Sequence, residues 1–164
     1  MKSNATLLLI GIIPFLSSCA SQRLVLAPVG PNPLQSNVSA GNTGFLRVFS
    51  EREPVSEGDT PIFYQPSEYK IYSAHGQLVK DVGNTNGHYD TAPRTVPLPA
   101  GRYTVKARAK DYLTVVVPVV IESGRTTSVH LDDRWRGPHD VPRAEFVFEP
   151  NGEPVGWSAE PPGR

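Results

Sequence analysis

The segment from Tyr103 to Ala109 constrains the fold most, because its side chains alternate in character at every step. One set of positions is apolar: Tyr103, Val105, Ala107 and Ala109. The interleaved set is polar or charged: Arg102, Thr104, Lys106 and Arg108. A period of two is typical of a β-strand with one buried face. A slip of one residue would bury cations without partners, so we predict that the apolar set faces a core and the charged set faces solvent.

Further short segments of strand character surround this one, separated by turn residues. The predicted strands are 45–49, 68–73, 78–82, 94–98, 113–121 and 126–131. The chain holds 17 prolines and 14 glycines, and no segment keeps a helical period. We therefore predict an all-β protein, with an antiparallel sandwich of about seven strands over residues 44–132. Pro118 has no amide hydrogen to donate, so we expect it at a sheet edge or a bulge.

The N-terminus joins a short apolar stretch to the only cysteine of the chain. Lys2 precedes the apolar run Thr6–Leu16, and the sequence then reads Leu16-Ser17-Ser18-Cys19. The run is too short for a membrane-spanning helix, which needs roughly 20 apolar residues. A basic residue followed by a short apolar run is instead typical of a secretory signal.

The run that ends at Cys19 resembles the lipobox of bacterial lipoproteins. The resemblance implies that residues 1–18 are a signal peptide that is removed, and that Cys19 is the lipid attachment site, acylated with chains such as palmitate. Ala20, rather than an aspartate, follows the cysteine, which implies sorting to the outer membrane. We therefore expect a protein of the bacterial cell envelope that is held to the membrane by its N-terminal lipid.

Two regions rich in proline, glycine and polar residues flank the predicted sandwich. Residues 19–43 are predicted to be the lipidated N-terminus and a flexible spacer, since apart from Leu24–Leu26 they lack the apolar content to fold alone. Residues 133–164 form a Pro/Gly-rich arm with an apolar segment at Glu145–Glu149 and a second one at Pro154–Trp157. We interpret these two segments as a short hairpin that either packs on the sandwich or is disordered alone.

Two stretches, Leu98–Val105 (LPAGRYTV) and Ile121–Leu131 (IESGRTTSVHL), are similar to motifs of known domains. They resemble the entry into the central strand and the closing hairpin of carboxypeptidase-regulatory-like and PEGA-type domains of bacterial envelope proteins. The resemblance covers roughly residues 44–132. It implies a prealbumin-like sandwich and a non-catalytic module.

The sequence carries no recognisable catalytic signature: no nucleophile elbow, zinc-protease helix, phosphate loop or C-x-x-C pair. Its 16 basic and 16 acidic residues balance, which gives no reason to expect nucleic acid as a partner. We therefore predict a non-enzymatic lipoprotein without a cofactor, whose partner is a protein or a glycan of the cell envelope. A carbohydrate- or peptidoglycan-binding module is the alternative, because tyrosines and tryptophans provide stacking platforms for sugars.

Two sets of residues are candidate ligand sites. Arg102, Lys106 and Arg108 share one strand face, near Lys70, and suit acidic glycans or lipid headgroups or simply form a solvated face. His88 and Asp90 lie in a polar loop, and with His75 or His130 they would form the site of a metal-assisted hydrolase, the remotest alternative.

Overall fold

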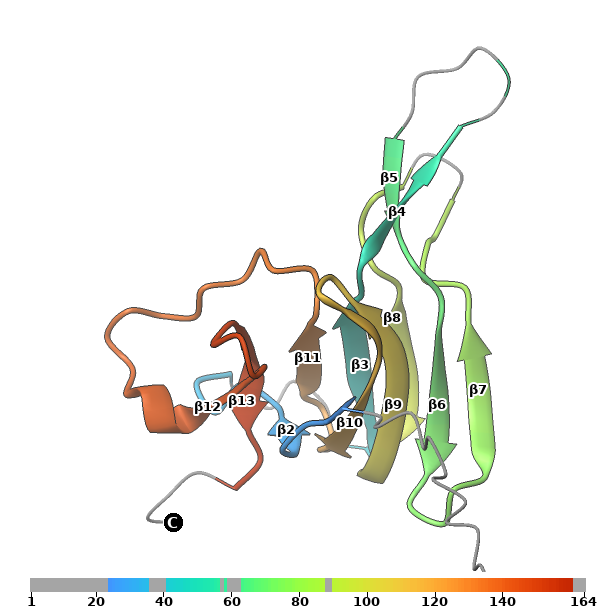
Figure 1. Cartoon of the computed structure of the whole chain (residues 1–164). Coiled ribbons are helices and arrows are strands. Elements are labelled where there is room, and N and C mark those ends of the chain that lie inside the picture. The colour runs from blue at the N-terminus through green and yellow to red at the C-terminus, as the bar shows by residue number, and fades with distance from the viewer. Residues whose placement is uncertain (1–23, 36–40, 57, 59–62, 88–89, 161–164) are drawn as a thin grey trace, which may run out of the picture.

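The computed structural model describes residues 24–35, 41–56, 58, 63–87 and 90–160 (Figure 1). Seven strands between Thr43 and His130 form two facing sheets, which confirms the predicted all-β sandwich. They are β3 (Thr43–Phe49), β6 (Tyr69–Ser73), β7 (Leu78–Val82), β8 (Thr95–Pro99), β9 (Gly101–Ala109), β10 (Tyr112–Ile121) and β11 (Thr126–His130). The larger sheet contains the order β10-β9-β6-β7, and the smaller sheet has the order β11-β3-β8.

The core lies between these sheets. Ile71, Val105 and Val117 from the larger sheet have no exposed surface, and neither do Leu46 and Val129 from the smaller one. These side chains come from the apolar positions of alternating strands, so burial of one face explains why the segments pair as they do.

Strand β9 has the predicted orientation. Val105 is fully buried and Ala107 nearly so, while Arg108 is exposed. Tyr103 is half-buried, and its hydroxyl donates a hydrogen bond to the carbonyl oxygen of Pro99 at 3.0 Å. Lys106 is only partly exposed, and its ammonium group lies over the ring of Tyr72.

Pairing within the sandwich is not wholly antiparallel. Strands β10, β9, β6 and β7 pair antiparallel, as do β3 and β8. Strand β11 pairs parallel to β3, with Val129 opposite Val48. The two strands are far apart in the sequence and need no hairpin between them, so the turn signals contain no information about their direction.

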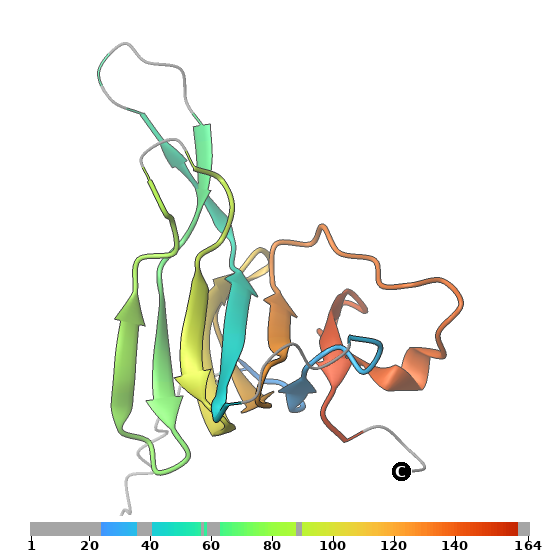
Figure 2. The same ribbon diagram turned by 180° about the vertical axis from the view of Figure 1, so that it is seen from behind.

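A two-stranded ribbon projects from one end of the sandwich (Figures 1 and 2). It consists of β4 (Arg52–Val55) and β5 (Phe63–Pro66), paired antiparallel with Val55 opposite Phe63. Neither strand was predicted, because Pro54 and Pro66 weaken their strand character.

The N-terminal region corrects the prediction of a flexible spacer up to residue 43. Strand β1 (Leu24–Val25) and strand β2 (Val29–Gly30) pair parallel to β10. Leu26 is 7% exposed and Val29 is fully buried in the common core. The few apolar residues of this region are buried in the core instead of facing water. Its backbone pairs with the edge of β10 that would otherwise be free.

This covered edge also corrects the expectation for Pro118. Strand β10 lies inside the sheet, with β9 on one side and β1 and β2 on the other. Pro118 is opposite Thr104 of β9, and it falls between Val116, which pairs with β1, and Val119, which pairs with β2. A proline is tolerated there because the neighbouring chain passes from one short strand to the next at that point.

The C-terminal arm forms the expected hairpin and belongs to the same fold, so the domain does not end at residue 132. A short 3-10 turn (η1, Arg143–Glu145) precedes β12 (Phe146–Phe148), which pairs antiparallel with β13 (Pro154–Ser158). Strand β13 pairs in turn with β2, and the larger sheet thereby reaches eight strands. None of the described residues belongs to a helix long and apolar enough to cross a bilayer.

Candidate ligand-binding groove

A groove of about 750 Å³ lies beside the outer face of β6 and β9. Residues of the β4–β5 ribbon and of β10 also line it, so it forms where the projecting ribbon meets the larger sheet. Its charged and aromatic lining includes Glu53, Glu68, Lys70, Tyr72, Lys106 and Arg108. Two of the three predicted basic residues, Lys106 and Arg108, therefore lie in one groove together with Lys70.

Lys70 and Lys106 are directly opposite each other on β6 and β9. The Nζ atom of Lys70 lies 3.2 Å from Oδ2 of Asp81, and this hydrogen bond raises the pKa of Lys70 above its ordinary value. The Nζ atom of Lys106 lies 4.2 Å from the centroid of the Tyr72 ring. The two lysines are therefore held differently: one by a carboxylate and the other by an aromatic face.

Arg108 connects β9 to the base of the ribbon. Its Nη2 lies 3.1 Å from Oε2 of Glu51, and its Nη1 forms a hydrogen-bonded ion pair with Glu53. Arg102, in contrast, lies outside the groove, with Nη1 3.6 Å from Oε1 of Glu160. The predicted basic stripe is thus divided between two environments.

The inner wall of the groove holds two buried hydroxyl groups. Tyr69 is 2% exposed and Ser67 is 4% exposed, and neither hydroxyl has a hydrogen-bond partner among the described residues. Burial raises the pKa of Tyr69 above its ordinary value. Nearby, the Asn84 amide donates to the Val48 carbonyl at 2.8 Å and to Ser50 Oγ at 3.0 Å, which fixes the loop after β7 to the sandwich.

Sequence reasoning missed Glu53 as a groove residue, and it considered Tyr72 only as one of several platforms for stacking sugars. The alternation of segment 68–73 placed Tyr72 on the same face as Lys70, and this signal was available. No comparable signal pointed to Glu53, since its position depends on the pairing of β4 with β5.

Of the predicted metal-binding residues, His88 lies outside the described residues, and Asp90, His75 and His130 lie in three different environments. Asp90 accepts hydrogen bonds from the Ala92 amide at 2.8 Å and the Asn86 side chain at 3.2 Å, and these bonds lower its pKa. His75 is exposed in the β6–β7 turn. Over the described ranges, no three histidine, cysteine or acidic side chains are arranged to hold a metal ion.

His130 belongs instead to an aromatic seam between β11 and the C-terminal arm, formed by Phe49, His130, Trp135, Phe146 and Trp157. Its ring stacks at 4.3 Å on Phe49 and at 4.7 Å on Trp135. Phe146 then packs against Trp135 at 5.5 Å and against Trp157 at 4.7 Å. Burial in this seam lowers the pKa of His130 to about 4.

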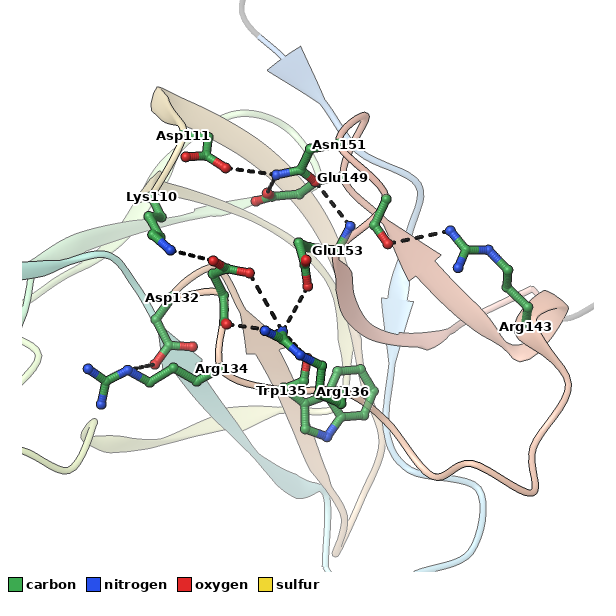
Figure 3. Close-up of polar contacts among 12 residues, drawn as sticks. Lys110, Asp111, Asp132, Arg134, Trp135, Arg136, Arg143, Glu149, Asn151 and Glu153 are labelled. Carbon is green, nitrogen blue, oxygen red and sulfur yellow. Dashed lines mark hydrogen bonds and ion pairs between the residues drawn. The ribbon is translucent and has the colours of Figure 1, made fainter.

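A charged cluster holds the other side of the arm, between the β9–β10 turn and the hairpin (Figure 3). It consists of Lys110, Asp111, Asp133, Arg136, Glu149, Asn151 and Glu153. Lys110 pairs with Asp133, and Arg136 reaches Glu153 at 2.8 Å.

Glu149 is the buried carboxyl of this cluster. The Asn151 amide donates to it at 3.3 Å and to Asp111 at 3.0 Å. Glu149 is 8% exposed, and its burial raises the pKa of the carboxyl to about 7. This carboxyl is therefore harder to ionise than an exposed glutamate.

The aromatic side chains considered for sugar stacking do not gather in one plane. Tyr64 is exposed on the ribbon, Tyr112 packs against the core, and Trp157 is buried. Trp135 stacks on His130. Tyr69 and Tyr72 both line the groove, but Tyr69 is only 2% exposed. A sugar bound in the groove would therefore find one partly exposed aromatic ring, Tyr72, rather than a platform of several rings.

No protein family, curated protein or solved structure matches this chain. The functional argument therefore depends on the residues and their geometry.

Proposed function

We propose that the protein is a lipid-anchored, non-catalytic binding protein of the bacterial envelope, whose sandwich presents the groove beside β6 and β9 to a partner. The observation that carries the binding role is the groove itself: a volume of about 750 Å³ in which Lys70 and Arg108 are held by ion pairs to neighbouring strands. Side chains held in this way lose little conformational entropy when a ligand binds.

The lipobox-like sequence at Cys19 supports the anchoring part of the proposal. Four residues lie between Cys19 and Leu24, where pairing with β10 begins. The five residue steps from Cys19 to Leu24 span at most about 17 Å, so a lipid on Cys19 would hold the sandwich close to the membrane surface. Two or more acyl chains would make that attachment stable.

Metabolic labelling with an alkyne fatty acid tests the anchor. The wild-type chain should incorporate the label, and Cys19→Ala should not. Ser21→Ala is the matched control, because Ser21 lies two residues after the cysteine and its change leaves the lipobox-like run intact, and this variant should label normally. Equal labelling of wild type and Cys19→Ala would refute the anchoring.

A second candidate function is binding of peptidoglycan or another glycan through the same groove. It is favoured by the mixture of hydrogen-bond donors and acceptors in the lining, together with the Tyr72 ring. The chain from Ala20 contains every residue that the structure describes, and it should be retained on purified sacculi. Failure to bind sacculi would leave a protein partner as the proposed ligand of the groove.

A further inference from the structure

We propose that Lys70 and Lys106 form an anion subsite in the groove, and that its ligand is an acidic sugar, a hydroxyl-rich ring that carries a single carboxylate or phosphate. This inference deepens the proposed binding function and rests on it. The evidence for it is the register of β6 and β9, the partners of the basic side chains, and the acidic residues of the groove.

The packing of the core places the two lysines opposite each other. Ile71 and Val105, the residues that follow Lys70 and precede Lys106, are opposite each other and fully buried. Their burial fixes the register, and this register places Lys70 opposite Lys106 on the outer face. Like charges directly opposite each other destabilise a sheet, so a bound anion between them would offset a repulsion that the fold itself imposes.

Lys106 is the cation that is available to a ligand. Lys70 pairs with Asp81, Arg102 with Glu160, and Arg108 with two glutamates. Within the described ranges, Lys106 has no carboxylate at ion-pair distance and lies over the Tyr72 ring instead. An ammonium group over an aromatic face keeps donors free for a further acceptor.

The acidic residues of the groove define the rest of the ligand. Glu53 and Glu68 line the same groove as the lysines. A polyanion, such as a bilayer rich in anionic lipid, would bring several negative charges against these carboxylates. A sugar with one acidic group avoids this repulsion, because its hydroxyls donate hydrogen bonds to carboxylates while its anion contacts the lysine pair.

Binding to defined sugars tests the proposal, using the chain from Ala20 and isothermal titration calorimetry. N-acetylmuramic acid supplies a carboxylate and N-acetylglucosamine 1-phosphate supplies a phosphate, while N-acetylglucosamine is the neutral counterpart of both. We expect at least one acidic sugar to bind about tenfold more tightly than the neutral sugar, as a charge-assisted contact provides. Lys106→Gln should remove this preference, and Lys106→Arg should retain it.

Arg102→Gln is the matched control. It removes a cation from the same face of the same strand, but outside the groove, and it should leave the affinity for acidic sugars unchanged. Equal affinity for neutral and acidic sugars, or an unchanged preference in Lys106→Gln, would overturn the anion subsite. Binding to phosphatidylglycerol vesicles and to neither acidic sugar would overturn the sugar as ligand.

Retention on sacculi separates this inference from the proposed function. If sacculi bind wild type and Lys106→Gln equally, the groove binds a glycan without the lysine pair, and only the anion subsite is wrong. If neither sacculi nor any sugar binds, the glycan-binding function and the anion subsite are both wrong. Labelling of Cys19 is independent of either result.

Discussion

The β9 region of the sandwich and the seam that holds the C-terminal arm are stabilised by different chemistry. Around β9, apolar side chains fill the core and the charged ones form ion pairs on the outer face. Around the arm, titratable groups are themselves buried: His130 between two aromatic rings of the seam, and Glu149 in the charged cluster on the other side. We therefore expect the sandwich to resist changes of pH and the docking of the arm to depend on them.

The largest expected effect comes from placing a charge in the β9 core. Val105→Asp should destabilise the protein by about 4 kcal/mol or more, because an unpaired carboxylate would lie among apolar side chains. Lys106→Ala, one position along, should change the free energy of unfolding by less than about 0.5 kcal/mol. Urea denaturation measures both. If Val105→Asp does not fold, Val105→Ala should still cost about 2 kcal/mol. Equal costs for positions 105 and 106 would contradict the assigned faces.

Acidification should weaken the arm through His130. The pKa of this imidazole falls from 6.5 to about 4 on folding. The undocked chain therefore takes up a proton first, and stability that is present above pH 6.5 is lost as the pH falls toward 4. The free energy of unfolding should fall by about 2–3 kcal/mol over this range. His130→Phe, which keeps an aromatic ring, should remove this acid-dependent loss in urea melts at pH 7 and pH 4.5.

His75→Gln is the control for this comparison, since His75 is exposed in the β6–β7 turn, and it should leave the acid dependence intact. An acid dependence that survives in His130→Phe would mean that the seam is not its source.

Close packing between the arm and the sandwich gives the next effect. A Cβ on Gly156 would lie 2.7 Å from the Ser128 carbonyl oxygen and 2.7 Å from Cγ1 of Val29. Gly156→Ala should therefore lower the free energy of unfolding by about 2 kcal/mol, since the backbone must move to admit the methyl group. Tryptophan fluorescence should report a partly undocked arm through Trp157. Gly83→Ala, where a Cβ meets no atom within 4 Å, should be nearly neutral.

The smallest effect should come from Glu149. Its pKa rises from 4.5 to about 7 in the folded protein, so its carboxyl opposes folding increasingly as the pH rises from 4.5 through 7. Asp111, Asp133 and Glu153 add to the cost of ionising it. Glu149→Gln should stabilise the protein by about 1 kcal/mol at pH 8 and by much less at pH 4. Glu160→Gln, an exposed change, should show no such pH dependence. A stabilisation equal at both pH values would contradict protonation as its cause.

These two regions also differ in how far the sequence predicted them. The alternation of residues 103–109 predicted β9 and its buried face, and the turn residues predicted its neighbours. Lys106 and Arg108 were recognised as one surface for the same reason. All of this depends on local periodicity, because the side chains of a strand must alternate between core and solvent.

The groove and the seam needed the tertiary structure. Nothing near Lys106 in the sequence specifies that Lys70 lies opposite it or that Tyr72 supports it, since strand order and register set those contacts. The residues beside the β10 edge looked like a flexible spacer because only a few of them are apolar. His130 was considered as a metal ligand because no local sequence pattern indicates that the rings of Phe49 and Trp135 enclose it.

The sequence by itself determined the fold class, the faces of the central strands and the lipobox-like N-terminus, because each depends only on short runs of neighbouring residues. The tertiary structure decided the extent of the domain, the docking of the arm and the composition of the groove. Those features depend on contacts between residues far apart in the chain, such as Val29 with Val119 or Trp157 with Gly30. Such contacts form only when burial in a common core outweighs the entropy of closing the loops between them.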